Sequence, residues 1–221
     1  AAFLLFQAYI DKVRLAQAIR GIAPAEMFQS VDIGRVPVFV GGLAGACLVF
    51  VFSSLAIRAV GRAAEQMIAE VRKQFREHPG IMEGTERPDY SKAVDISTTA
   101  ALKQMILPGA LAIGVPILVG LVLKYEATAA LLMIGTMAGV LMATTMNNGG
   151  GAWDNAKKFI ESGGLKNADG TTVGKGTETH AAAVVGDTVG DPFKDTAGPA
   201  LHVLVKLLST ITLVLAPLFI S

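Results

Sequence analysis

Cysteine is almost absent from this sequence. Cys47 is the only one, so no disulfide framework is available, and its position inside an apolar segment predicts a buried, inert thiol. Basic clusters interleaved with aromatic residues are also missing, and a formal net charge of +1 gives no indication of nucleic-acid binding. The chain opens with "AAFLLFQAYI" (residues 1–10), which lacks the basic region of a signal peptide. We expect it to be the second half of a spanning helix in a longer protein.

Several patterns typical of soluble enzymes are missing as well. The sequence contains no Ser-His-Asp set and no Cys-His pair, and we expect His78 and His180 to be structural or solvated. The stretch "GTTVGKG" (170–176) resembles a phosphate-binding loop, but three residues rather than four separate its first glycines, and Gly176 follows Lys175 where serine or threonine is required. The sequence therefore gives no support for a nucleotide site here.

Charge is absent or nearly absent from four segments, each about as long as a membrane span. Hydrophobic residues make up 52% of the sequence, and segments 36–57, 104–123 and 127–146 contain no charged residue, while 196–220 contains only Lys206. A helix needs about 20 apolar residues to cross a bilayer. We therefore predict an all-α, multi-pass integral membrane protein, with residues 1–221 forming part of one membrane domain in the lipid bilayer.

The distribution of lysine and arginine predicts the orientation of these spans. Segment 58–103 contains eight basic residues and 154–194 contains five, against four in 10–35 on the opposite side. Positive charge is enriched in cytoplasmic segments, so we place 58–103 and 154–194 in the cytoplasm and the C-terminus outside. Helical spacing continues over 58–78, which predicts a helix extending well into the cytoplasm and broken by the proline and glycine residues of 78–90. The short connection 123–127 predicts an antiparallel hairpin.

Polar residues recur at helical spacing in "GDTVGDPFKDTAGPALHVLVK" (186–206). At about 100° per residue, seven positions fall within about 120° of one helix face if the helix is regular. They are Asp187, Asp191, Lys194, Asp195, Gly198, His202 and Lys206. This face predicts a carboxylate cluster with one ammonium at its start and a second lysine inside the membrane.

Lys206 lies deep within its apolar segment. Ten residues without formal charge precede it and fifteen follow it, so its ammonium cannot easily reach the interface by snorkelling. An ionisable residue at this depth faces protein or water and is a functional hypothesis by default. We predict that a carboxylate from a helix outside this chain pairs with it.

A second polar cluster follows the span 127–146. Asp154, Lys157 and Lys158 in "GGAWDNAKKFIE" form an i, i+3, i+4 set, which in isolation also fits an ordinary solvated helix end with an ion pair. Beside the 187–195 cluster it indicates more, because several carboxylates at one place require cations. Carboxylate oxygens suit Mg²⁺, and neighbouring lysines suit phosphate oxygens. The pattern predicts a Mg²⁺-dependent reaction in which water attacks phosphorus.

The same stretches resemble a known family. "GGAWDNAKKFIE" and "GDTVGDPFKDTAGPALHVLVK" are similar to the C-terminal signature of membrane-bound, ion-pumping inorganic pyrophosphatases, and "PGIMEGTERPDY" and "ILPGALAIGVPILVG" resemble the preceding loop and helix. The resemblance implies a bundle of about sixteen helices in a homodimer, of which this chain is the last third, with an N-terminal remainder. It also implies that pyrophosphate is hydrolysed at a cytoplasmic site and that an ion is pumped outward.

The resemblance also implies roles for individual residues. Asp154, Asp187 and Asp191 fall on acidic Mg²⁺ positions, and Lys157 and Lys194 fall on pyrophosphate-binding positions. Asp195 falls on a carboxylate that orients the attacking water, and Lys206 falls on the lysine of the ion gate. We therefore predict Asp191 and Asp195 to be catalytic, all four aspartates to be metal ligands, and His202 to lie beside Lys206 in the gate.

Several functional alternatives remain at this stage. No aspartate accompanies Lys206, so we expect protons rather than Na⁺ to be pumped, with K⁺ as an activator, in a cell inner membrane or the membrane of an acidic compartment. A sodium-pumping pyrophosphatase is the nearest alternative. An intramembrane prenyltransferase also pairs DxxxD with Mg²⁺ and pyrophosphate, and a non-enzymatic ion transporter is the third hypothesis. We expect the chain by itself to be inactive.

Overall fold

A computed structural model describes residues 1–220, which are almost entirely helical. No β-strand occurs in this range, where an isolated antiparallel bridge joins Lys166 and Thr172. The helices are α1 (Ala2–Ile19), α2 (Val36–Glu77), α3 (Gly80–Glu83), α4 (Tyr90–Glu161), α5 (Glu178–Pro192) and α6 (Gly198–Leu215), with short 3-10 turns at Pro24–Glu26 and Ala216–Ile220. Helix α1 thus extends beyond the segment 1–10 that the sequence indicated.

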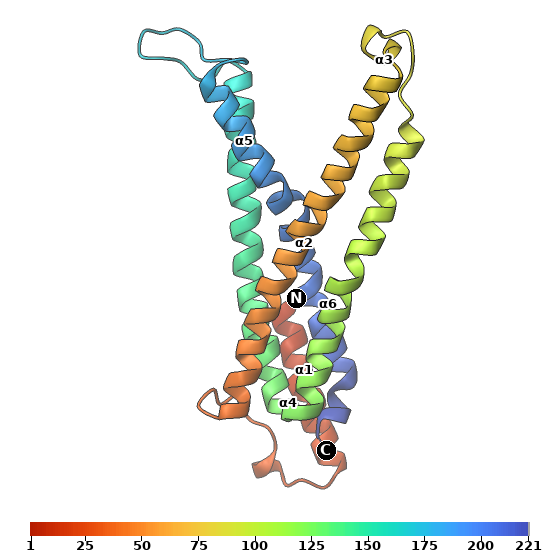
Figure 1. The fold of residues 1–221 in the computed structure, drawn as a ribbon. Coiled ribbons are helices and arrows are strands. Elements are labelled where there is room, and N and C mark those ends of the chain that lie inside the picture. Colours follow the sequence, from red (N-terminus) through yellow and green to blue (C-terminus); the bar gives the residue numbers. More distant parts are fainter. Residues whose placement is uncertain (221) are drawn as a thin grey trace.

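Helix α4 consists of two antiparallel arms joined at Lys124. This residue has φ 71° and ψ −174°, far from helical values, so the chain reverses there. Figure 1 shows the first arm running down beside α2 and the second arm returning on the other side of the molecule. The hairpin predicted from the short connection 123–127 is confirmed.

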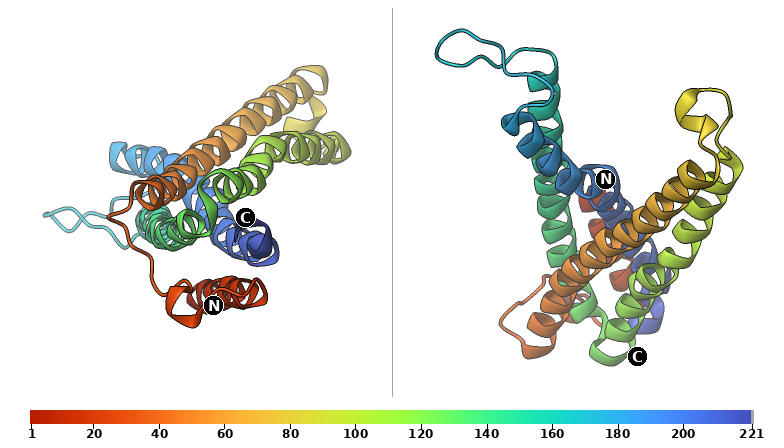
Figure 2. Two further views of the ribbon diagram at one scale, coloured as in Figure 1. Left: turned by 90° about the horizontal axis from the view of Figure 1, so that it is seen from below. Right: turned by 45° about the horizontal axis from the view of Figure 1, so that its top comes forward.

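The α2 helix and the first arm of α4 form a long pair that diverges from α5 and the second arm (Figures 1 and 2). Helix α2 is continuous to Glu77, and α3 and the turn after it occupy the predicted break. At the tip, the side chain of Gln74 accepts a hydrogen bond from the Asp89 N–H (2.9 Å) and donates one to the Asp89 carbonyl (3.2 Å). These contacts fix the tip.

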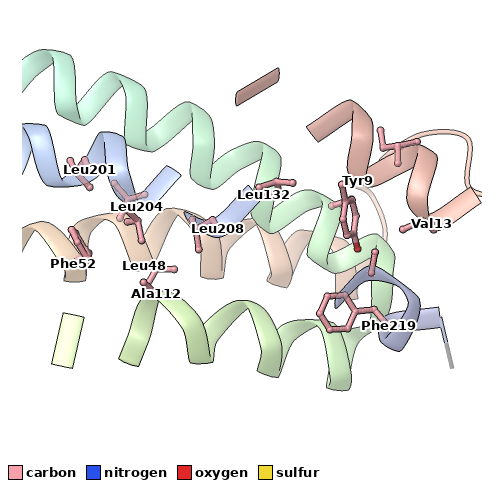
Figure 3. Close-up of a cluster of buried hydrophobic side chains, with 14 of the residues drawn as sticks. Tyr9, Val13, Leu48, Phe52, Ala112, Leu132, Leu201, Leu204, Leu208 and Phe219 are labelled. Carbon is pink, nitrogen blue, oxygen red and sulfur yellow. The ribbon is translucent and has the colours of Figure 1, made fainter. Parts of the chain in front are cut away.

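The core lies where α1, α2, α4 and α6 meet (Figure 3). Leu132, Leu201 and Leu208 are fully buried there, and the hydroxyl of Tyr9 donates a hydrogen bond to the Tyr125 carbonyl at 3.0 Å. Glycine lets α2 approach α4 closely. A Cβ at Gly45 would lie 2.4 Å from the Leu131 carbonyl oxygen, so no larger residue fits without separating the helices.

The C-terminal segment 187–206 is not one regular α-helix, so the angles predicted for its seven polar positions on a regular helix do not apply across its whole length. A π turn over Phe193–Ala197 separates α5 from α6, with the Gly198 N–H bonded to the Phe193 carbonyl. Pro192 and Pro199 flank this turn and have no N–H to donate, which interrupts the regular α-helical pattern. The extra residue changes the direction in which everything after Ala197 points.

Candidate functional site

The candidate site forms where the second arm of α4 crosses α5. The two helices meet at a pair of glycines, since a Cβ at Gly150 would lie 2.5 Å from the Gly190 carbonyl oxygen. The indole of Trp153 lies over the same region, 3.2 Å from where a Cβ at Gly186 would be, and its ring centroid is 6.3 Å from that of Phe193. Backbone contact at the crossing brings the side chains one turn further along α4 against those of α5.

Lys194 lies at the centre of this crossing. Its ammonium is 3.3 Å from a carboxylate oxygen of Asp154 on α4 and 3.4 Å from one of Asp187 on α5. It also pairs with Asp191, one turn before it, and lies 3.7 Å from Asp195. A single cation therefore contacts all four aspartates that the sequence selected, and the structure brings these residues together as predicted.

A second pair links the two helices directly. Lys157 of α4 forms an ion pair with Asp187, while Lys158 turns to Asp154 on its own helix at 2.8 Å. The hydrogen bond from Lys157 holds the pKa of Asp187 below its usual range, and that of Asp154 is lowered mainly by Lys158 and then by Lys194. The pKa of Lys194 is raised, chiefly by Asp191. Asp154, Asp187 and Lys194 therefore stay charged at neutral pH.

The four carboxylates differ in exposure. The side chain of Asp187 is only 8% exposed, while that of Asp195 is 66% exposed. Asp187 therefore pairs with lysines inside the crossing, whereas the exposed side chain of Asp195 has room for further partners. Asp195 is thus the carboxylate most open to a substrate or to water.

The donor set has the chemistry that Mg²⁺ requires, because carboxylate oxygens are its preferred protein ligands. No three His, Cys, Asp or Glu side chains in residues 1–220 converge closely enough to hold a metal by themselves. The ammonium of Lys194 provides the positive charge between the carboxylates instead. The residues thus fit shared binding, in which Mg²⁺ takes one or two carboxylates here and its other ligands elsewhere.

Lys206 and His202 lie beyond the π turn and do not join this cluster. Both residues are exposed on α6. Across residues 1–220, no ion pair or hydrogen bond of the Lys206 ammonium is found; its backbone carbonyl accepts a hydrogen bond from Thr210 at 2.9 Å. The predicted carboxylate partner from another helix therefore stays a prediction.

One interaction near the site was not predicted from the sequence. Nε2 of His180, near the start of α5, lies 3.0 Å from a carboxylate oxygen of Glu161 at the end of α4, and the ammonium of Lys175 lies 3.9 Å from the same carboxylate. Glu161 lies one turn after Lys157 on α4, and this spacing could have predicted that its carboxylate lies beside the site. The contact closes the far end of the α4–α5 crossing.

These features define an integral membrane protein: residues 1–220 contain three helices long and apolar enough to cross a bilayer, and a lysine–carboxylate cluster lies where α4 crosses α5. The chain belongs to the family described as "Inorganic H+ pyrophosphatase", whose sequence profile matches residues 1–215.

Three relatives illustrate the similarity. The chain is 62% identical to a "K(+)-insensitive pyrophosphate-energized proton pump 2" of Moorella thermoacetica, over 100% of this chain and 30% of that protein. It is 60% identical to a "K(+)-insensitive pyrophosphate-energized proton pump" of Caldanaerobacter subterraneus, over 99% of this chain and 29% of that protein. A "Putative K(+)-stimulated pyrophosphate-energized sodium pump" of Clostridium tetani is 54% identical over 90% of this chain and 28% of its own length. The chain thus spans less than a third of these relatives.

Proposed function

We propose that the whole protein to which this chain belongs hydrolyses inorganic pyrophosphate with Mg²⁺ and uses the reaction to pump protons out of the cytoplasm. The observation that carries this proposal is the contact of Lys194 with four carboxylates from two helices. Such a balance of charges suits a substrate that is a polyanion accompanied by divalent cations. The names of the relatives agree with it.

The residues of this chain have distinct roles in the proposed reaction. Lys157 and Lys194 bind phosphate oxygens as point charges, which positions the substrate and neutralises charge that develops in the transition state. Asp195, the most exposed of the four carboxylates, orients a water molecule together with Asp191 and accepts its proton. The water oxygen forms a new bond to one phosphorus while the bridging P–O bond breaks, which gives two phosphates.

Mg²⁺ belongs to this proposal as a partner of the carboxylates. Asp154, Asp187, Asp191 and Asp195 are the ligands that this chain offers, and bound Mg²⁺ would neutralise the phosphate oxygens. The remaining ligands come from an N-terminal remainder of the protein, which fits a chain that spans only 30% of a relative. The site faces the cytoplasm, and the active protein is a homodimer in its membrane.

Protons are the proposed ion, with Lys206 and His202 as gate residues. The relatives at 62% and 60% identity are named K(+)-insensitive proton pumps, against 54% for the one named a K(+)-stimulated sodium pump. These names favour proton transport that does not require K⁺ as an activator. The prenyltransferase and transporter hypotheses receive no support from them.

The test uses the full-length protein in inverted membrane vesicles. Phosphate release from pyrophosphate and quenching of a pH-sensitive dye are measured together, with and without Mg²⁺, Na⁺ and K⁺. We expect Mg²⁺-dependent hydrolysis with acidification of the vesicles that needs neither Na⁺ nor K⁺. Asp195→Asn should lose both activities, while Asp169→Asn in the distant loop, the matched control, keeps both. Hydrolysis by Asp195→Asn at the wild-type rate would contradict the catalytic assignment.

A further inference from the structure

The π turn lies between the two parts of the proposed pump. Asp191 precedes it, Lys194 and Asp195 lie within it, and Lys206 follows it on α6. A π turn contains one residue more than an α turn, and π turns inside helices occur frequently at functional sites. Moving or removing the turn would rotate α6 by about 100° relative to α5, because each residue of an α-helix contributes that angle.

The side chain of Asn147 on α4 lies against this turn. A Cβ at Gly198 would lie 1.9 Å from Oδ1 of Asn147, so the amide oxygen touches the backbone where α6 begins. This oxygen is buried, and no donor in residues 1–220 hydrogen-bonds to it. A buried acceptor without a partner is rare in native proteins and calls for an explanation.

We infer that Asn147 is a positioning residue. By assisting movement of the π turn, it couples the aspartate cluster (Asp154, Asp187, Asp191 and Asp195) to Lys206. When the turn shifts, backbone N–H groups near Gly198 lose their partners. Oδ1 of Asn147 is the acceptor placed to receive them. It therefore reduces the cost of rotating α6 and, with it, Lys206. The inference rests on the proposed function, since it assigns a route between hydrolysis and ion transport.

The neighbouring residues make this assignment specific to Asn147. Asn148 has the same side chain but is exposed, and Gly151 has open space where its Cβ would be. Gly198 is the position that allows the contact, because any side chain there would displace Asn147. The polar side chain at residue 147 and the absence of a side chain at residue 198 therefore act together.

The first experiment compares Asn147→Leu with Asn148→Leu in the full-length protein in inverted vesicles. Leucine keeps the branching and the number of side-chain heavy atoms of asparagine, although it is bulkier, and it removes the acceptor. For Asn147→Leu we expect hydrolysis close to the wild-type rate and about fivefold or greater loss of protons transported per pyrophosphate. Asn148→Leu should keep the wild-type ratio. An unchanged ratio in Asn147→Leu overturns the inference. If the leucine variant fails to assemble, Asn147→Ala is measured in the same assays.

The second experiment separates packing from polarity. Gly198→Ala places a methyl group against Asn147 and should reduce hydrolysis, because it displaces the α4–α6 contact near Lys194. The double variant Gly198→Ala/Asn147→Ala removes the collision with Asn147 and leaves a tight 3.0 Å contact with the Phe193 carbonyl oxygen, so hydrolysis should largely recover while protons per pyrophosphate stay low. Recovery of both quantities would show that Asn147 only fills space and would overturn the inference.

A third measurement does not depend on activity. Hydrogen exchange of the peptide that covers 193–198 reports how often the π turn opens. We expect exchange about fivefold or more slower in Asn147→Leu, with Asn148→Leu unchanged, because the released N–H groups lack their acceptor. Equal exchange in both variants overturns the inference. Wild-type protein without pyrophosphate hydrolysis would instead contradict the proposed function, and the exchange result would still decide the role of Asn147.

Discussion

Gly150 of α4 lies against Gly190 of α5 so closely that a Cβ on the first would be 2.5 Å from the carbonyl oxygen of the second. Backbone atoms cannot move aside as a flexible side chain can, so this contact sets the separation of the helices that carry Asp154 and Asp187. The geometry of the aspartate cluster thus depends on two residues that have no chemistry of their own.

Gly150→Ala should therefore damage catalysis more than folding. The added methyl group moves α5 away from α4 and separates Lys157 from Asp187. We expect at least about a tenfold fall in kcat/KM for pyrophosphate, since misplacement by about 1 Å can cost on the order of 100-fold. Gly151→Ala is the matched control, because its Cβ meets nothing within 4 Å among residues 1–220. Equal activity of the two variants would contradict this role for the glycine contact.

A second glycine contact supports the membrane-embedded packing. A Cβ at Gly45 would lie 2.4 Å from the carbonyl oxygen of Leu131, and Gly135 lies in the same contact. Gly45→Val should destabilise the full-length protein by about 1–3 kcal/mol through overpacking, measured as the midpoint of thermal inactivation in detergent. Gly114→Val, where the described residues leave open space, should change the midpoint much less. A midpoint unchanged by Gly45→Val would show that the helices separate freely.

Long runs without charge were enough to predict the helices, because few features other than a membrane span require about 20 consecutive apolar residues. The sequence also indicated the site, since Asp154 and Lys157, and Asp187 and Asp191, recur one turn apart. The pairing of Lys157 with Asp187 rather than Asp154 was not predictable. It depends on how two helices cross, and the pattern within one helix contains no such information.

The π turn at Phe193–Ala197 was not predicted from the sequence. Helical periodicity assumes a constant angle per residue, and a single extra residue at 193–197 invalidates it for everything that follows. Pro192 and Pro199 were recognised as sites of bending, but proline signals the loss of a hydrogen bond without specifying which turn replaces it. The angle predicted between Lys206 and Asp187 therefore does not hold across this turn.

The Glu161–His180 contact predicts a pH-dependent stabilisation. His180 lowers the pKa of Glu161, so this carboxylate stabilises the folded protein above the ordinary pKa of glutamate, about 4.3, and the effect is lost as the pH falls through the lowered value. Glu161→Gln should therefore lower the thermal midpoint at about pH 7, and its effect should weaken as the pH falls below about 4.3.

The control for this measurement is Glu178→Gln, which removes an exposed carboxylate from the same end of α5. Its effect should be small at both values of pH. The ammonium of Lys175 lies 3.9 Å from the same carboxylate. A Glu161→Gln effect that does not weaken below about pH 4.3 would mean that the charge of Glu161 does not contribute to stability.

Lys206 supplies the last prediction, which concerns transport rather than hydrolysis. Its residue is exposed on α6 and lies beyond the π turn, away from the carboxylates that contact Lys194. Lys206→Met keeps the length of the side chain and removes its charge. Because the aspartate cluster is untouched, pyrophosphate hydrolysis should continue, while protons transported per pyrophosphate fall by about fivefold or more. Lys175→Met in the loop 162–177 is the control and should keep the wild-type ratio. A charge within the membrane that is not part of the ion path only costs stability, so a variant with wild-type coupling and a raised thermal midpoint would remove Lys206 from the gate.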